Sequence, residues 1–127
     1  MLRQVIQLLL DRAKEIEVVG EAPDLDDALE EAQNLQPDVI LMNDYLPPID
    51  SAHATKLFRE AGLFTPILII SMEIKPDMIP HSLASGANGF MYKDEMGTFL
   101  TEAIRAVYNG EQYLSPLATS ALSDEVR

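Results

Sequence analysis

Residues 37–50 read PDVILMNDYLPPID, and this stretch decides how the rest of the chain is interpreted. Its apolar run, VILM, lies between Asp38 and Asn43. A short apolar run that ends in turn residues is typical of a strand buried on both faces of a parallel sheet. The two prolines that follow can neither extend a strand nor donate to its ladder. We therefore predict a strand over 38–43 whose carboxyl end, at Asn43 and Asp44, is where functional groups of open α/β sheets collect.

The composition of the chain is that of one ordinary globular domain. It has 127 residues, of which 47% are hydrophobic and 24% are charged. No apolar run approaches the roughly 20 residues of a membrane span, and there are no cysteines for disulfides or thiol chemistry. The net charge of −12 repels nucleic acid and anionic membranes, so we expect no direct binding to either. A cytoplasmic location is the simplest expectation.

Segments with the pattern of helices and segments with the pattern of strands alternate along the chain. Helices are recognised by apolar residues that recur at helical spacing, and strands by short apolar or β-branched runs. The pattern predicts helices over 2–14, 25–35, 53–61, 77–85, 98–109 and 116–126, and strands over 16–21, 38–43, 66–71 and 89–92. This alternation indicates an α/β fold, in which helices cover both faces of a parallel sheet.

The helix predicted over 25–35 has a clear start signal. Asp24 is a candidate N-cap residue, with Asp27 three positions later. Several acidic residues gather here, and we interpret them as a solvated helix face near a positive helix N-terminus, with a cation site as the alternative. They are Asp24, Asp26, Asp27, Glu30 and Glu31.

Several motifs together point to a known family. The motifs IEVVGEA, PDVILMN, LPPID, TPILIIS, GANGFMYKD and AIRAVYNGEQYLSP resemble receiver domains of two-component response regulators of the NarL/FixJ type. The resemblance covers the chain from Leu2 onward and implies a flavodoxin-like sheet with strand order 2-1-3-4-5. It implies that the chain starts inside the first helix, so that the first strand, central in the sheet, is absent.

The resemblance also divides the chain. It implies a receiver-like domain over 1–114, and an extra helix or linker over 115–127 that leads towards a DNA-binding domain in such regulators. The chain would then be either a receiver fragment of a transcription regulator or a stand-alone receiver.

The resemblance assigns roles at the carboxyl ends of the strands. In such domains a carboxylate attacks a phosphodonor, Mg²⁺ is held by an acidic pair, and a lysine and a hydroxyl bind the phosphoryl oxygens. Asn43 falls on the phosphoacceptor, Ser71 on the hydroxyl, Lys93 on the lysine and Phe90 on the switch aromatic. An amide cannot form an acyl phosphate, and Asp44 is expected to point away because side chains alternate along a strand. The acidic pair has no counterpart.

The remaining polar residues receive structural interpretations. We expect Lys93 to hydrogen-bond Asn43 or its neighbourhood, because a buried amide needs partners. We expect Phe90 to belong to the core more than to a switch. His53 and His81 lack the spacing of metal ligands and are interpreted as surface residues, and Asp50 as structural.

An absent middle strand leaves three alternatives. Adjacent strands lie about 4.8 Å apart, so removing one leaves about 10 Å between its neighbours. The 16–21 strand could pair directly with the 38–43 strand, a second chain could share the open edge, or an upstream strand could belong to the natural protein. We favour direct pairing or a dimer for this chain. Whether the truncation and Asn43 are natural or engineered stays open.

The functional prediction is a receiver-like domain in signal transduction that acts as an interaction and dimerisation module without phosphorylation, and that is not an enzyme. Expected partners are a histidine kinase or another receiver, with a homodimer favoured. The family's dimerisation face is made by the 77–85 helix, the 89–92 strand and the 98–109 helix. No cofactor is expected, except Mg²⁺ if the acidic pair were restored. The alternative is a Mg²⁺-dependent phosphoacceptor of a transcription regulator, seen truncated or mutated.

Overall fold

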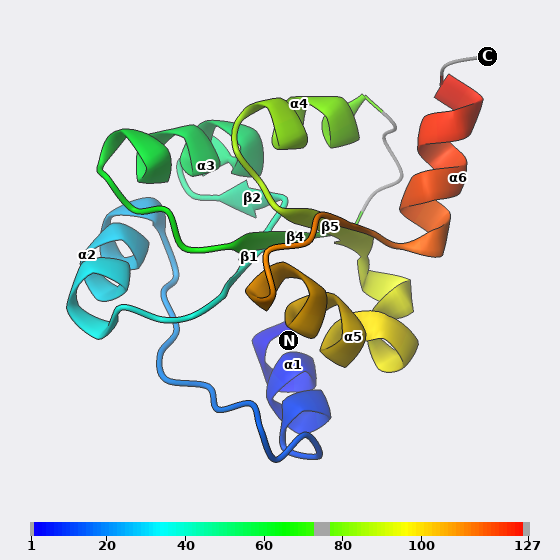
Figure 1. The fold of residues 1–127 in the computed structure, drawn as a ribbon. Coiled ribbons are helices and arrows are strands. Elements are labelled where there is room, and N and C mark those ends of the chain that lie inside the picture. Colours follow the sequence, from blue (N-terminus) through cyan, green and yellow to red (C-terminus); the bar gives the residue numbers. More distant parts are fainter. Residues whose placement is uncertain (1, 73–76, 126–127) are drawn as a thin grey trace.

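The computed structural model describes residues 2–72 and 77–125, and its fold is drawn in Figure 1. The chain folds into helices and strands that alternate over most of its length. In order these are α1 (Leu2–Leu10), α2 (Leu25–Leu35), β1 (Ile40–Asn43), β2 (Tyr45–Leu46), β3 (Ile49–Asp50), α3 (Ser51–Glu60), β4 (Ile67–Ser71), α4 (Met78–Ala84), β5 (Gly89–Tyr92), the 3-10 helix η1 (Lys93–Glu95), α5 (Met96–Tyr108), β6 (Tyr113–Leu114) and α6 (Pro116–Glu125).

The central sheet has four parallel strands in the order β1-β4-β5-β6, which confirms the predicted α/β fold with a parallel sheet. A two-stranded antiparallel ladder, β2 with β3, follows β1. In the described part of the chain, no helix is both long and apolar enough to span a membrane.

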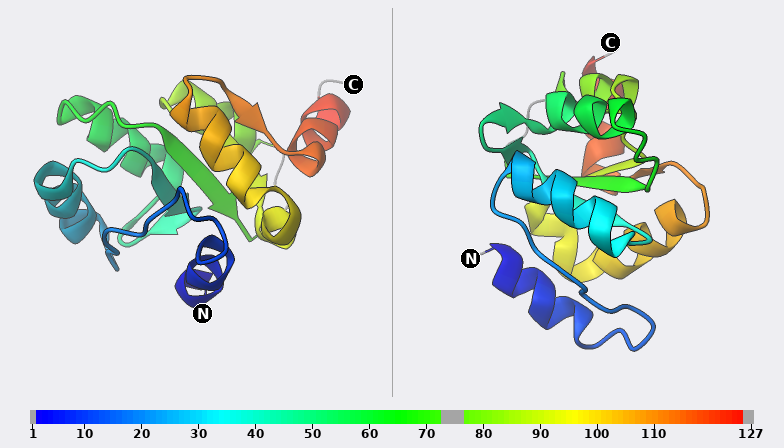
Figure 2. Two further views of the ribbon diagram at one scale, coloured as in Figure 1. Left: turned by 60° about the horizontal axis from the view of Figure 1, so that its bottom comes forward. Right: turned by 90° about the vertical axis from the view of Figure 1, so that its left-hand side faces the viewer.

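Helices cover the sheet on both faces (Figures 1 and 2). Side chains of β4 alternate between the two resulting cores, as the strand period of two requires. Ile67 and Ile69 pack with residues of α2, α3, α4 and α6, whereas Leu68 and Ile70 pack with residues of α1 and α5. Every residue of β4 and β5 is buried, as expected for interior parallel strands.

The predicted strand over 16–21 is wrong. This segment has no strand conformation and belongs to neither sheet, and α1 ends at Leu10 instead of residue 14. A strand needs a neighbouring backbone with which to exchange hydrogen bonds, and among the described residues no backbone hydrogen bond joins residues 17–20 to β1. Direct pairing of these two segments, one of the alternatives considered from the sequence, therefore does not occur.

A groove lies beside β1, on the side away from β4. It has a volume of about 1000 Å³ and is bounded by the 15–23 segment on one side and β1 on the other. The burial of β1 reflects this open side, because Ile40 and Leu41 are only half-buried and Asn43 is exposed. The sequence predicted β1 to be buried on both faces, and the groove explains why it is not.

The opposite edge of the sheet is closed. β6 pairs with β5, and α6 then packs against β5 with Ala118 fully buried. The buried carboxylate of Glu95 holds this arrangement: it accepts hydrogen bonds from the backbone N–H of Tyr92 at 3.1 Å and of Leu117 at 2.9 Å. Ser115 caps α6 by accepting a 3.2 Å hydrogen bond from the Ala118 N–H at its side-chain oxygen.

Arg59 ties the end of α3 to the loops that flank β4. Its guanidinium donates to the carbonyls of Leu63, Thr65 and Gly86 at 2.8 Å each, and to the Asn88 side chain at 2.9 Å. The Asn88 side chain in turn accepts from the Ile67 N–H. Only a planar, multidentate cation can satisfy four acceptors in this fork geometry.

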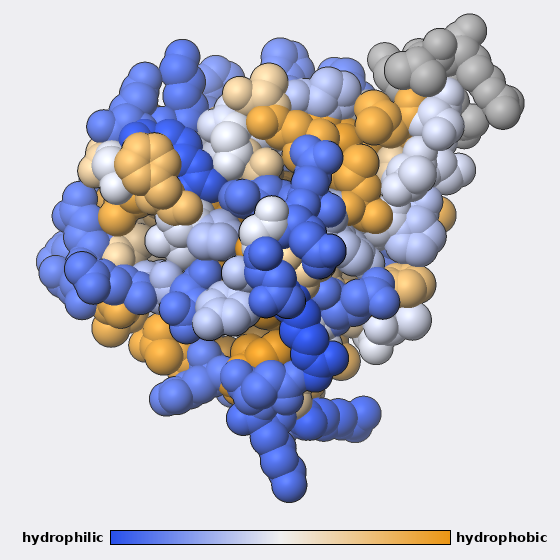
Figure 3. Space-filling model, in the orientation of Figure 1, coloured by the Kyte–Doolittle hydropathy of each residue, from blue (hydrophilic) through white to orange (hydrophobic). Residues whose placement is uncertain are grey.

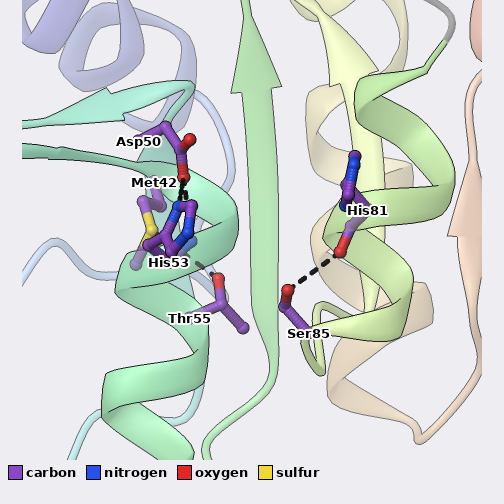
Figure 4. A network of polar contacts seen from close by, with 6 residues as sticks. All are labelled: Met42, Asp50, His53, Thr55, His81 and Ser85. Carbon is purple, nitrogen blue, oxygen red and sulfur yellow. Dashed lines mark hydrogen bonds and ion pairs between the residues drawn. The ribbon is translucent and has the colours of Figure 1, made fainter.

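Asp50 starts α3, as its structural interpretation anticipated. Its carboxylate accepts hydrogen bonds from the backbone N–H of His53 at 2.9 Å and contacts the His53 ring at 2.8 Å. Figure 4 shows this pair beside Thr55 and Met42, with His81 on the neighbouring helix α4. Both histidines are exposed, in agreement with their surface interpretation.

We predict that Arg59→Ala lowers the free energy of unfolding by about 1.5–3 kcal/mol, the usual range for hydrogen bonds to a charged group. Arg59→Lys should lose most of the same stability, because an ammonium cannot reproduce the fork. Urea unfolding measures both effects, with the exposed α3 residue Lys56→Ala as the control, expected to change stability by no more than about 0.5 kcal/mol. Equal stability of Arg59→Ala and the control would contradict this role.

The Asp50 cap should make stability depend on pH. The backbone hydrogen bond from His53, assisted by the His53 ring, lowers the pKa of Asp50 below 3.8. The folded state therefore gains stability that is present above the unfolded pKa and is lost as pH falls through the lowered folded value. Asp50→Ala should cost about 1 kcal/mol at pH 7, and this difference should shrink in urea titrations towards pH 3. A difference unchanged by pH would contradict the assignment.

Candidate functional site

The carboxyl ends of β1 and β4 meet at one edge of the sheet. Their parallel register places Asn43 opposite Ile70, so that Ser71 is one residue further along. The loop after each strand starts here, which is where open α/β sheets build their sites. The candidate site is therefore the edge formed by residues 43, 44 and 71, with the end of β5 beyond it.

Asp44, rather than Asn43, contacts the hydroxyl of Ser71. The Asp44 Oδ2 atom accepts a hydrogen bond from Ser71 Oγ at 3.0 Å and another from the backbone N–H of Met72 at 3.2 Å. The expectation that Asp44 points away is wrong for a physical reason. β1 ends at Asn43, and Asp44 lies in a bend, so the alternation of side chains along a strand no longer fixes its direction.

Sequence reasoning missed this contact, although a signal for it is present. Asn43 is followed four residues later by Pro47, and Asp44 is followed four residues later by Pro48. The motif therefore keeps its spacing to a proline when it is read one residue later. A pattern with two readings one residue apart cannot decide which side chain faces Ser71. The structure decides in favour of Asp44.

Asn43 itself is exposed. In the described part of the chain no hydrogen bond joins its side chain to Lys93, which is half-buried and begins η1 directly after β5. The residues assigned to one pocket are thus only partly brought together: Ser71 contacts its acidic neighbour, whereas Lys93 and Asn43 make no direct bond to each other in the structure.

Phe90 lies in the hydrophobic core. It is fully buried on β5, and its ring packs edge-on against Tyr92 with centroids 5.6 Å apart and planes 80° apart. This T-shaped geometry is the favoured one for aromatic pairs. The contacts of Phe90 match the core interpretation.

The acidic residues of α2 form a separate feature. Asp24 caps the helix, as predicted, by accepting the Asp27 N–H at 2.9 Å. A hollow of about 320 Å³ lies beside Asp27, Glu30 and Glu31. Among the described residues no three His, Asp or Glu side chains converge in a way that could hold a metal ion.

The site can therefore offer one oriented carboxylate with a hydroxyl partner. An ionised carboxylate is a nucleophile for phosphorus, and a neighbouring hydroxyl and N–H can bind anionic oxygens. The neutral Asn43 amide can accept and donate hydrogen bonds, yet it lacks the charged oxygen that attack on phosphorus requires.

Comparison with known proteins supports the same architecture. The family described as "Response regulator receiver domain" matches residues 1–105. The oxygen regulatory protein NreC of Staphylococcus carnosus is 32% identical over 126 residues, which cover 98% of this chain and 58% of that protein. The chain thus spans little more than half the length of such relatives.

Solved structures show the same likeness in three dimensions. A LuxR-family two-component response regulator from Aurantimonas sp. SI85-9A1 superposes with a TM-score of 0.92 at 26% identity, over 98% of this chain and 89% of that one. The signal receiver domain of the putative response regulator NarL from Mycobacterium tuberculosis superposes with a TM-score of 0.80 at 32% identity, over 87% and 89%. The chain therefore belongs to the receiver domain family of two-component response regulators.

Proposed function

We propose that this receiver domain transmits its signal through protein contacts, without a phosphoryl group on residue 43. The observation that carries the proposal is Asn43 at the end of β1, because its amide cannot form an acyl phosphate. Its position is the one that the family resemblance gives to the phosphoacceptor. Family membership supports a role in two-component signal transduction, and the step beyond it is the independence from phosphorylation.

A second candidate function rests on a different observation. The carboxylate of Asp44 is bonded to the Ser71 hydroxyl and the Met72 N–H, an arrangement that could also hold phosphoryl oxygens. In this alternative an oxygen of Asp44 attacks the phosphorus of a phosphohistidine or small phosphodonor, and the donor's bond to phosphorus breaks. The acceptor would then lie one residue later than the motif suggests.

Intact mass spectrometry after incubation with acetyl phosphate and Mg²⁺ distinguishes the two. The first proposal predicts no adduct on the unsubstituted chain. An adduct of about 80 Da, the mass of a phosphoryl group, that disappears in Asp44→Asn would instead establish Asp44 as the acceptor and overturn the first proposal.

Two further variants control this experiment. Asp38→Asn removes a carboxylate at the opposite end of β1, and should leave any specific adduct unchanged. Asn43→Asp restores a carboxylate at residue 43, so an adduct in this variant alone would show that the rest of the pocket is competent and that the amide is what blocks phosphorylation.

The interaction partner we favour is a second copy of this domain, which docks on the face that includes α4 and α5. β6 and α6 cover the edge and one side of β5, so the surface that remains for a partner is contributed mainly by the two helices. Figure 1 shows α6 beside β5, on the side of the sheet that also carries α4.

The net charge gives a test of this association. Two copies that each carry −12 repel one another, and salt screens that repulsion. We expect sedimentation velocity to show a dimer whose dissociation constant falls as salt rises. Ala84→Arg, at an exposed position of α4, should weaken it at least about tenfold, the effect of about 1.4 kcal/mol. Gln33→Arg, at an exposed position of α2, serves as the control, and equal effects would contradict the placement.

A further inference from the structure

Helix α6 has a weak intrinsic tendency to form. Its sequence, PLATSALSDE, includes a threonine and two serines, which favour helices less than alanine or leucine does. It has no basic residue in its last turn, where a positive charge would stabilise the helix dipole. An isolated helix of only ten residues is marginal in water. The folded state of α6 therefore depends on its contacts with the rest of the domain.

The contact between α6 and the rest of the domain is narrow. Among the side chains of residues 116–123, only that of Ala118 is buried, and those of Ala121 and Leu122 are half-buried against the same core. Leu117 is 44% exposed. Figure 1 shows α6 at the end of the sheet opposite to α2, and Figure 3 shows apolar surface between α4 and α6. Few side chains thus hold the helix in place.

The carboxylate of Glu95 joins the start of α6 to the end of β5. The carboxylate is buried, and its Oε1 atom accepts the Tyr92 N–H while its Oε2 atom accepts the Leu117 N–H. Leu117 is the second residue of α6, so its N–H is one of those that the helix itself cannot satisfy. A negative charge at this end is also favoured by the helix dipole. One side chain therefore stabilises both the helix and its docking.

The hydroxyl of Tyr92 acts in the opposite direction. Tyr92 packs in the same core as Ala118, and its hydroxyl is buried with no hydrogen-bond partner among the described residues. Burial, together with the nearby charge of Glu95, raises the pKa of Tyr92, so the hydroxyl keeps its proton at neutral pH. A buried donor without an acceptor is unfavourable, and water would satisfy it on exposure. The docked arrangement thus contains a group that favours opening.

The residues that hold α6 follow directly from the candidate site. Ser71, which donates to Asp44, is paired in register with Tyr92. The short helix η1, Lys93–Glu95, comes next, so three residues lead from the end of β5 to the carboxylate that holds α6. A shift at the carboxyl ends of β4 and β5 would therefore be passed on to the start of α6.

We propose that α6 is a releasable arm of this domain. Glu95 holds its docked state, the Tyr92 hydroxyl favours its released state, and the carboxyl ends of β4 and β5 bias the balance between the two. Any ligand that prefers one state shifts the balance by its difference in affinity. The inference does not rest on the proposed function, because it involves neither phosphoryl transfer nor a dimer.

Hydrogen exchange of individual amides in the full chain, followed by NMR, tests this proposal. The amides of Ala121 and Leu122 report on α6, and that of Ile69 in β4 reports on global unfolding. Glu95→Gln keeps the size of the side chain but leaves one acceptor oxygen for two N–H groups. We expect exchange in α6 to become at least about tenfold faster, with a much smaller change at Ile69. Glu102→Gln, the same change at an exposed position of α5, is the matched control and should leave α6 unchanged.

A second variant should move the balance the other way. Tyr92→Phe removes the unpaired hydroxyl and keeps the shape of the ring, so exchange in α6 should become at least about threefold slower. Tyr108→Phe, at an exposed position of α5, is the control and should have no effect. Because Tyr92→Phe preserves the packing of the core, this measurement decides the question even if Glu95→Gln folds poorly.

A third variant tests the link to the candidate site. Asp44→Ala removes the acceptor of the Ser71 hydroxyl and the Met72 N–H, which frees the end of β4, and should make exchange in α6 faster. Asp38→Ala, before the other end of β1, should not. Equal exchange in the two glutamine variants, exchange in Tyr92→Phe that is not slowed, or no response of α6 to Asp44→Ala would each overturn the proposal.

Discussion

The pairing of β4 with strands on both of its sides is the constraint on which the rest of the structure depends. Its five residues are all buried, and the side chains of residues 67–70 point alternately into two hydrophobic cores. Each core needs its own helices, so the layered arrangement follows from this one strand. The same pairing brings the ends of β1 and β4 together, and thereby brings the Asp44 carboxylate within reach of Ser71.

The two edges of the sheet, at β6 and at β1, differ in what covers them. On the β5 side, the chain supplies its own closure with β6, α6 and the Glu95 carboxylate that holds the first turn of α6. On the β1 side, the neighbouring 16–21 segment stays outside hydrogen-bonding contact with the sheet. The candidate site thus lies at the ends of β1 and β4, towards the side of the sheet that β6 and α6 do not close.

Much of the fold could be predicted from the sequence, because the signals were local. The cap at Asp24, the buried runs of β4 and β5 and the helical stripe of α5 each depend on neighbours along the chain. The 16–21 segment has the composition of a strand but pairs with no strand of either sheet. Whether a segment finds a strand to pair with depends on the whole fold and not on its own composition. The contact of Asp44 was missed because it depends on where β1 ends, and sequence patterns place such boundaries least well.

The closure at β6 has a consequence for how large an assembly this domain could join through its sheet. A strand that offers hydrogen bonds on a free side invites stacking of sheets end to end, as in fibres. Here β6 is only two residues long and runs straight into α6, so that end offers almost no template. The sheet therefore cannot grow into an open-ended filament through this end, because continuous growth needs a usable strand at both edges.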